Sequence, residues 1–322
     1  MNLLRMIPRL ALLVLLGLGS GSLLAQSRAD DPLTKQQTAG LRLLHGAIDM
    51  HFHMDPPTDK TPGAVIDNIR AMRLLGMRGL VLKSHGESTA GLAYVLGREL
   101  PDMTIIGGIA LNRGVGGISV GAVERLASLK GRPGRMVWMP TDDSAAYAKT
   151  QPGRPLVPLS KNGQLLPEVK AVIAFIAKND LILATGHSAP EDALLVLKEG
   201  QAQGAKHMIA THAMELIGKM TVDQIQQAVN LGAIVELDFR HLIESGGIDV
   251  IKKMGPEHFF ISQFWTYQLW PPSPEPFKPI EYGGLEQVGR FVEEMHAQGI
   301  TDEQLDLMAK TNPARLLGLP VE

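Results

Sequence analysis

The sequence predicts an α/β protein built as a (β/α)8 barrel, and three observations support this fold class. Short apolar segments alternate with amphipathic segments of helical length from residue 46 to the C-terminus. There are eight such apolar segments over about 280 residues, which is the usual size of this barrel. A glycine-rich dinucleotide loop does not follow the first apolar segment, which disfavours an open doubly wound sheet.

Each predicted strand is a short apolar run bounded by turn-forming or polar residues. The strands cover 46–53, 79–84, 104–111, 135–140, 181–185, 207–211, 233–237 and 259–262. Helices are predicted where apolar residues recur at helical spacing, over 63–75, 88–99, 167–178, 190–203, 221–230, 244–254, 284–298 and 302–316. Two proline-rich stretches interrupt the pattern: 142–166, expected to be a loop or small hairpin, and 265–283. Strands separated by helices imply right-handed parallel crossovers.

The N-terminal segment 1–25 has the pattern of a secretory signal peptide. Arg5 and Arg9 give a positive start, an apolar stretch follows, and Ala25-Gln26 is a suitable cleavage junction. An uncleaved anchor is the alternative, but the apolar stretch is short for a full membrane span. We therefore expect a periplasmic or secreted protein without a stable span, with an N-terminal arm over 26–45 and a barrel over 46–322.

Composition limits the classes of partner. Apolar residues make up 45% and charged residues 20% of the chain, which is an ordinary globular composition. The formal net charge is −2 without a basic block, so nucleic acid is not an expected partner. The absence of cysteine excludes disulfides. We expect a small-molecule substrate, and the sequence leaves the oligomeric state open, a homo-oligomer included.

The most informative motif is the pair His51 and His53 at the end of the first predicted strand. Side chains two apart in a strand point to the same side, so the two imidazoles project together. Side-by-side neutral imidazoles chelate a divalent metal. His85, His187 and His212 follow later strands, at the barrel face where active sites lie. The sequence therefore predicts a metal site, for Zn first and Mn or Fe as alternatives.

Seven ordered motifs carry a resemblance to a known group: IDMHFHMDP (48–56), GMRGLVLKSH (76–85), GGIALN (107–112), VWMPT (137–141), ATGHS (184–188), THAMEL (211–216) and NPARLLGL (312–319). Together they resemble the amidohydrolase superfamily of metal-dependent hydrolases, and more closely the family of unknown function DUF6282. The resemblance implies a barrel with His51, His53, His187 and His212 as metal ligands.

Two positions depart from the superfamily pattern. Gln263 stands where the superfamily usually has an Asp that binds metal and accepts a proton from water, and a neutral amide cannot act as that base. A lysine is also missing after the fourth strand, where binuclear members place a carboxylated bridge. Lys83, after the second strand, either takes that role or is a cation that holds substrate or pairs with Glu236. His85 is either a ligand or a group that orients another imidazole.

Several other residues are candidates for proton transfer and substrate contact. Glu236 shares its strand face with Asp238 and is our candidate general base, with an inward structural or salt-bridge role as the alternative. Asn112 follows the third strand, and Trp265 and Tyr267 lie in the second proline-rich stretch. We expect these three to contact substrate, although the aromatic residues alternatively pack against the barrel rim.

These features predict a metal-dependent hydrolase that activates water to cleave an amide, a lactone or a related small ester. Two alternatives stay open. The position of His85 resembles that in the polymerase-and-histidinol-phosphatase group, which favours a phosphoesterase. The presence of Gln263 instead of Asp is also consistent with a catalytically weak protein that binds a metal or a ligand.

Overall fold

The structure is a computed structural model of the 322-residue chain. It describes residues 32–54, 64–149, 153, 155–215, 219–239, 242–264 and 285–321. The predicted signal peptide and the candidate substrate residues Trp265 and Tyr267 lie outside the described residues, so these interpretations stay predictions.

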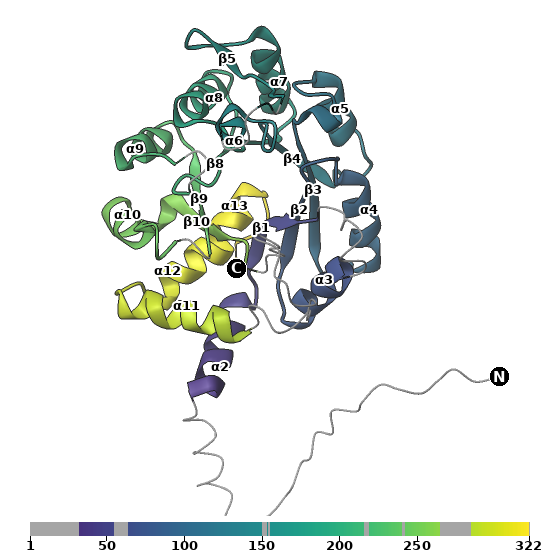
Figure 1. The fold of residues 1–322 in the computed structure, drawn as a ribbon. Helices are drawn as coiled ribbons and strands as arrows, with labels where there is room; N and C mark the ends of the chain where they lie inside the picture. Colours follow the sequence, from purple (N-terminus) through teal and green to yellow (C-terminus); the bar gives the residue numbers. More distant parts are fainter. Residues whose placement is uncertain are drawn as a thin grey trace, which may run out of the picture.

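Eight parallel strands form one sheet that curves into a barrel (Figure 1). In sheet order they are β1 (Ile48–His53), β2 (Gly79–Lys83), β3 (Thr104–Ala110), β4 (Gly134–Trp138), β7 (Ile182–Ala184), β8 (His207–Ala210), β9 (Ile234–Asp238) and β10 (Phe259–Ser262). The first and last strands also contact each other. The predicted (β/α)8 barrel is confirmed, with every predicted strand end within two residues of the observed one.

The helices surround the strands (Figure 1). They are α3 (Ala64–Leu74), α4 (Ala90–Glu99), α5 (Val120–Ala127), α7 (Pro167–Lys178), α8 (Pro190–Ala202), α9 (Val222–Asn230), α10 (Gly247–Met254), α11 (Leu285–Ala297), α12 (Asp302–Asp306) and α13 (Asn312–Leu316). Helix α5 was not predicted, because it has only eight residues and contains Gly121 in a glycine-rich neighbourhood. Its Ser119 side chain caps the helix by accepting from Ala122 N at 3.3 Å.

The stretch 142–166 contains a short helix, α6 (Ala145–Ala148), and a small hairpin. The hairpin pairs β5 (Ser160–Lys161) with β6 (Gln164–Leu165) in antiparallel fashion. Asn162 and Gly163 at its turn have φ angles of 53° and 73°, a left-handed pair that suits a two-residue hairpin. The expected loop or small hairpin is therefore present.

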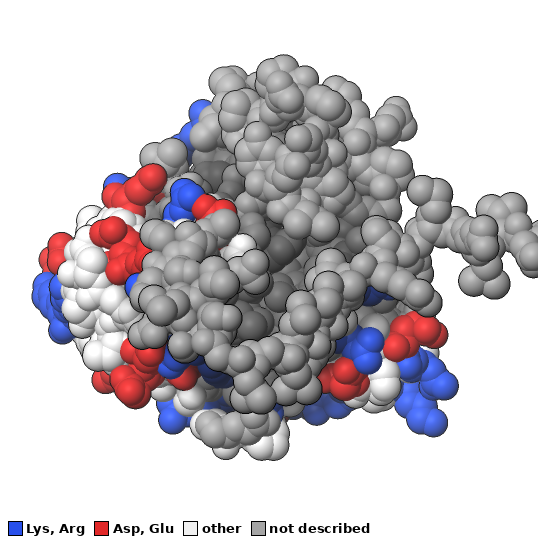
Figure 2. All heavy atoms as spheres, turned by 90° about the horizontal axis from the view of Figure 1, so that it is seen from below, with Lys and Arg blue, Asp and Glu red and all other residues white. Residues whose placement is uncertain are grey.

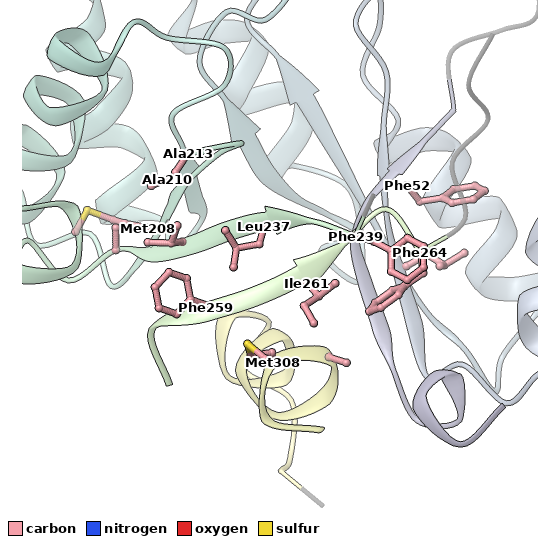
Figure 3. Packing of buried hydrophobic residues seen from close by; sticks show 14 of the residues in the cluster. Phe52, Met208, Ala210, Ala213, Leu237, Phe239, Phe259, Ile261, Phe264 and Met308 are labelled. Carbon is pink, nitrogen blue, oxygen red and sulfur yellow. The ribbon is translucent and has the colours of Figure 1, made fainter. Parts of the chain in front are cut away.

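Apolar side chains form two layers, one inside the barrel and one between strands and helices. Inside lie residues such as Val81, Trp138 and Phe260, and Leu316 of α13 and the following Leu317 close one end. The outer layer is larger and includes the residues of Figure 3, where Phe259 and Ile261 of β10 lie near Met308 of the adjoining helical turn η3 (Leu307–Thr311).

The alternation of the two layers determines which polar side chains reach the barrel interior. Lys83 lies two residues after the inward Val81, and Ser262 lies two residues after the inward Phe260. Glu236 likewise follows Ile234, which packs against the inner layer. All three are buried. Lys83 and Ser262 are the last residues of their strands, at the barrel face where active sites are located, and Glu236 lies in the middle of β9.

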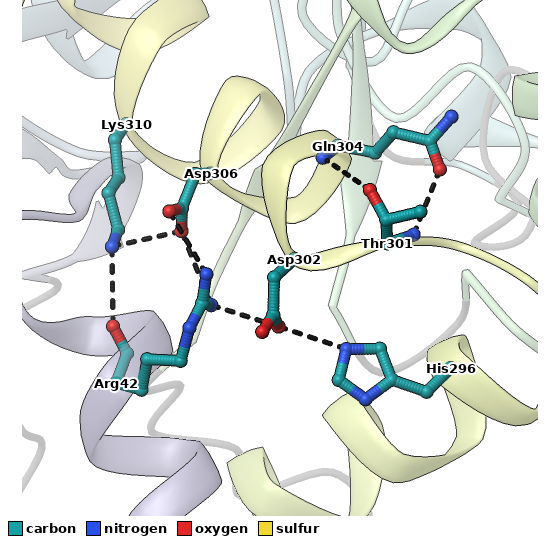
Figure 4. Close-up of polar contacts among 7 residues, drawn as sticks. All are labelled: Arg42, His296, Thr301, Asp302, Gln304, Asp306 and Lys310. Atoms are coloured by element: carbon teal, nitrogen blue, oxygen red, sulfur yellow. Dashed lines mark hydrogen bonds and ion pairs between the residues drawn. The ribbon is translucent and has the colours of Figure 1, made fainter.

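The described part of the N-terminal arm, from residue 32, is largely helical, which the sequence did not predict. Helix α2 (Pro32–Leu44) packs against α11 through glycines, because a Cβ atom on Gly289 would lie only 1.9 Å from Gln36 O. Arg42 of α2 forms ion pairs with Asp302 at 3.1 Å and Asp306 at 3.2 Å (Figure 4). These contacts attach the arm to the C-terminal helices.

The described surface carries both signs of charge. In the view of Figure 2, acidic and basic side chains are intermixed on the part of the face that is described. Within the described ranges, no helix is both long and apolar enough to cross a membrane.

Candidate metal centre

Five imidazoles form a closed ring at the carboxyl ends of the strands. Ring centroids lie 4.9 Å apart for His51 and His53, 5.2 Å for His53 and His85, and 5.6 Å for His85 and His187. The centroid of His187 lies 5.5 Å from that of His212, and the centroid of His212 lies 4.6 Å from that of His51, which closes the ring. The structure therefore brings together all five histidines that the sequence selected as metal ligands.

Irregular backbone at two points helps to place these rings. The pairing of β1 with β2 shifts register between Asp49 and Phe52, next to His51. Such irregularities commonly redirect side chains near active sites. His212 has a φ of 48°, a left-handed conformation that is unfavourable for a residue with a side chain.

Carboxylates lie against Nδ1 of three of the imidazoles, and the two shortest of these contacts are at His51 and His212. The Glu236 Oε1 atom lies 2.5 Å from His51 Nδ1 and also accepts a hydrogen bond from Ser262 Oγ at 2.7 Å. The Glu215 Oε1 atom lies 2.6 Å from His212 Nδ1. A carboxylate at one ring nitrogen orients the imidazole and leaves Nε2 for a metal. The sequence analysis missed Glu215, although its place three residues after His212 was a usable signal.

His85 has a different polar environment. Its Nδ1 lies 2.7 Å from Thr141 Oγ1 and 3.2 Å from Asp142 Oδ1. Asn112, the predicted substrate contact, is buried and makes four hydrogen bonds within the protein, to His85, Thr141 and Asp143. These bonds use both amide hydrogens and both acceptor directions of Asn112. The geometry therefore supports a role in holding loops rather than in substrate contact.

The electrostatics favour neutral imidazoles at three of the five positions. Burial lowers the pKa of His51, His85 and His187, and the nearby Lys83 ammonium lowers it further. A neutral imidazole has the lone pair that a metal requires.

The carboxylates have the opposite effect at His212. Burial lowers its pKa, but Glu215 and Glu236 outweigh that effect and raise the pKa to about 9. Burial also raises the pKa of Glu236 to about 7. Glu215 and Glu236 thus favour a positively charged His212 imidazole.

The donor set fits a divalent transition metal. Ligand atoms of His51, His212 and Glu236 lie within 4.8 Å of one another, as do those of His212, Glu215 and Asp238. Among the described residues, His51 Nε2 is a buried nitrogen without a hydrogen-bond partner. Buried polar atoms are rarely left in this state, and coordination of a metal would satisfy this nitrogen. Imidazole and carboxylate donors suit divalent transition metals such as Zn, Mn and Fe.

Asp49 connects the first and last strands beside the ring. Its Oδ1 accepts from His51 N and Gln263 N, both at 3.0 Å, and its Oδ2 accepts from Phe264 N at 3.1 Å. Gln263 has a left-handed φ of 60°, and its Nε2 lies 3.4 Å from His212 Nε2. Gln263 therefore borders the ring of five imidazoles.

Two further side chains border the ring. Lys83 is fully buried, with Nζ 5.8 Å from the centroid of the Trp138 ring. Tyr147 on α6 lies 6.1 Å from His187, ring to ring. Tyr147 was not selected from the sequence, because it belongs to an insertion without a clear pattern.

The family of the chain follows from its sequence match. Residues 46–236 match DUF6282, a family of unknown function, and this segment is more than half of the chain. The chain therefore belongs to DUF6282. No curated protein matches the sequence.

The fold is similar to that of several solved hydrolase structures. The organophosphorus hydrolase from Deinococcus radiodurans has 13% identity and a TM-score of 0.57, over 85% of this chain and 93% of that one. An amidohydrolase from Pseudomonas aeruginosa has 11% identity and a TM-score of 0.50, over 87% and 97%. The probable dipeptidase PvdM from the same organism has 12% identity and a TM-score of 0.51, over 89% and 98%. At these identities the similarity establishes the barrel fold.

Proposed function

We propose that this protein is a metal-dependent hydrolase that cleaves a lactone, an amide or a related small ester outside the cytoplasm. The observation that carries the proposal is the closed ring of five imidazoles, three of which have a carboxylate at Nδ1. The similarity in fold to an organophosphorus hydrolase, an amidohydrolase and a dipeptidase supports the same general chemistry.

The residues that would hold the metal are His51, His53, His187 and His212, with His85 as a fifth donor. A bound divalent metal lowers the pKa of water to about 7 and polarises a carbonyl oxygen. The protein contributes a buried set of donors in fixed orientations. Lys83, buried beside the ring, would add positive charge where the substrate oxygen becomes negative.

A general base is also needed, and the contacts of the carboxylates favour a division of roles. The 2.5 Å contact with His51 Nδ1 supports a positioning role for Glu236, in place of the general-base role that we predicted from the sequence. Asp238 is buried at the end of the same strand, with a carboxylate oxygen within 4.8 Å of a His212 nitrogen. We propose that an Asp238 carboxylate oxygen accepts the proton of the attacking water.

Two variants test this division of roles. Loss of turnover with full metal content in Asp238→Asn, together with loss of metal in Glu236→Gln, would support it. A loss of turnover of about 10²–10⁴-fold in Glu236→Gln, the usual contribution of a general base, with full metal content would instead identify Glu236 as the base.

The proposed function is tested with the full chain loaded with Zn or Mn and assayed against lactones, esters, amides and phosphate esters. We expect turnover of a carboxylic substrate that is lost in His51→Gln and kept in His296→Gln, a matched change of an exposed histidine. Turnover of phosphate esters alone would favour the phosphoesterase alternative. Activity that emerges only in Gln263→Asp would identify a catalytically weak protein.

A further inference from the structure

A buried network joins the three loops that follow β2, β3 and β4. Asn112, after β3, donates through Nδ2 to His85 O at 2.9 Å and to Thr141 Oγ1 at 2.7 Å. Its Oδ1 accepts from Thr141 N at 2.8 Å and from Asp143 N at 3.2 Å. Asn112 is 2% exposed and Thr141 is fully buried, so water does not compete for these bonds.

The direction of each hydrogen bond in this network is determined by the backbone. Backbone N–H groups only donate, so the Asn112 atom that faces Thr141 N and Asp143 N must be the carbonyl oxygen. This fixes the orientation of the amide, which places its NH2 group against Thr141 Oγ1. Since an amide nitrogen only donates, Thr141 Oγ1 accepts from Asn112.

The same hydroxyl oxygen is the nearest partner of His85. Thr141 Oγ1 lies 2.7 Å from His85 Nδ1, and Asp142 Oδ1 lies 3.2 Å from that same nitrogen. An ionised carboxylate only accepts, so its approach to Nδ1 is favourable only when Nδ1 carries hydrogen. Both oxygens then accept from Nδ1–H, and Nε2 holds the lone pair. The hydrogen bond at one ring nitrogen thereby decides which nitrogen can bind a metal.

We propose that Asn112 and Thr141 are positioning residues that set the tautomer of His85, so that its Nε2 serves as a fifth nitrogen donor in the ring of imidazoles. This assignment rests on the proposed metal-dependent function. The ring supports it, because His85 lies between His53, at 5.2 Å, and His187, at 5.6 Å. The loops after β2, β3 and β4 thus act together on one ligand.

The test compares Thr141→Val, which removes the hydroxyl and keeps the shape, with Thr141→Ser, which keeps the hydroxyl. The first measurement is the ¹⁵N imidazole spectrum of the metal-free full chain, with the His85 signals identified by their loss in His85→Gln. We expect the Nδ1–H tautomer in the wild-type protein and in Thr141→Ser, and a larger Nε2–H fraction in Thr141→Val.

The second measurement is the Zn dissociation constant, obtained by competition with a chromophoric chelator. Loss of a group that orients a ligand typically weakens metal binding by about 10–100-fold, which we expect for Thr141→Val. Thr141→Ser should restore the affinity. Thr89→Val is the matched control, because Thr89 is also buried and its hydroxyl donates to a backbone oxygen, Leu82 O, at 2.7 Å.

Three outcomes would overturn the inference. One is an Nε2–H tautomer of His85 in the wild-type protein, and another is a Thr141→Val variant with an unchanged tautomer and unchanged Zn affinity. The third is a shift of tautomer in Asp142→Asn but not in Thr141→Val, which would assign the role to the carboxylate. Failure of the hydrolase screen would remove the proposed function without affecting the metal-free spectrum, so the two failures are distinguishable.

Discussion

Replacement of Asp49 by Asn should destabilise the protein by about 1–2 kcal/mol at pH 8, because its carboxylate connects β1 to the end of β10. Asp49 is fully buried and accepts three backbone hydrogen bonds at 3.0–3.1 Å, from His51, Gln263 and Phe264. The side-chain amide of Asn can place its oxygen where Asp49 Oδ1 accepts two bonds, from His51 N and Gln263 N. Its NH2 group then faces the Phe264 N–H, which leaves a buried donor without an acceptor.

The magnitude follows from these three bonds. An unsatisfied buried donor costs about 1–3 kcal/mol, and the other two bonds lose the extra strength of a charged acceptor, about 1 kcal/mol in total. Burial raises the pKa of Asp49 to about 6, so the native site disfavours the charge, and Asn returns part of this cost at pH 8, where the carboxylate is ionised. The net loss at that pH is therefore smaller than the sum of the bond contributions, about 1–2 kcal/mol.

Urea unfolding of metal-free protein measures the change in the free energy of unfolding. The matched control is Asp302→Asn, an exposed carboxylate that pairs with Arg42 and His296 and should change stability by less than about 1 kcal/mol. If the free energy of unfolding of Asp49→Asn is within about 0.5 kcal/mol of that of the wild-type protein, the proposed connection between the first and last strands is refuted.

Three further predictions concern other parts of the chain. Burial lowers the pKa of His207 below 6.5, so the native state binds fewer protons than the unfolded state and loses stability as the pH falls below about 6.5. Urea unfolding at pH 5 and at pH 7.5 should show a smaller loss of stability at pH 5 for His207→Gln than for the wild-type protein, and an unchanged pH dependence would contradict this. Arg42→Ala should lower the free energy of unfolding by less than about 1 kcal/mol, and by still less at high salt, because the ion pairs of Arg42 are partly exposed. A large loss of stability that does not depend on salt would contradict this prediction. Residues 1–30 fused to a reporter that is active only outside the cytoplasm should give signal, whereas a silent reporter would argue against export.

The barrel could be predicted because its signals are local. Eight apolar runs separated by amphipathic segments define the strands, and the observed helix α7 has the predicted bounds. Helices α2 and α5 escaped prediction for physical reasons. Helix α2 is stabilised by contact with α11 through Gly40 and Gly289, which lie far apart in sequence, and α5 is short and contains Gly121.

The candidate site was predictable only in part. The five histidines could be selected because each follows a predicted strand, and strand ends converge at one face of a barrel. Their partners depend on rotamers and loop geometry, which the sequence pattern does not encode. The contact of Glu236 with His51 joins residues 185 positions apart, and Asn112 is held by bonds to the neighbouring loops. The roles of these residues therefore emerge from the structure.

The central claim is that the five imidazoles hold a divalent metal, and elemental analysis of the purified full chain tests it most directly. After expression with added Zn or Mn, we predict about one transition metal per chain, and chelation should lower the melting temperature because the metal binds only the native state. His51→Gln combined with His187→Gln should lose the metal, whereas His296→Gln should keep it. A wild-type protein without transition metal, or equal metal content in all three proteins, would contradict the claim.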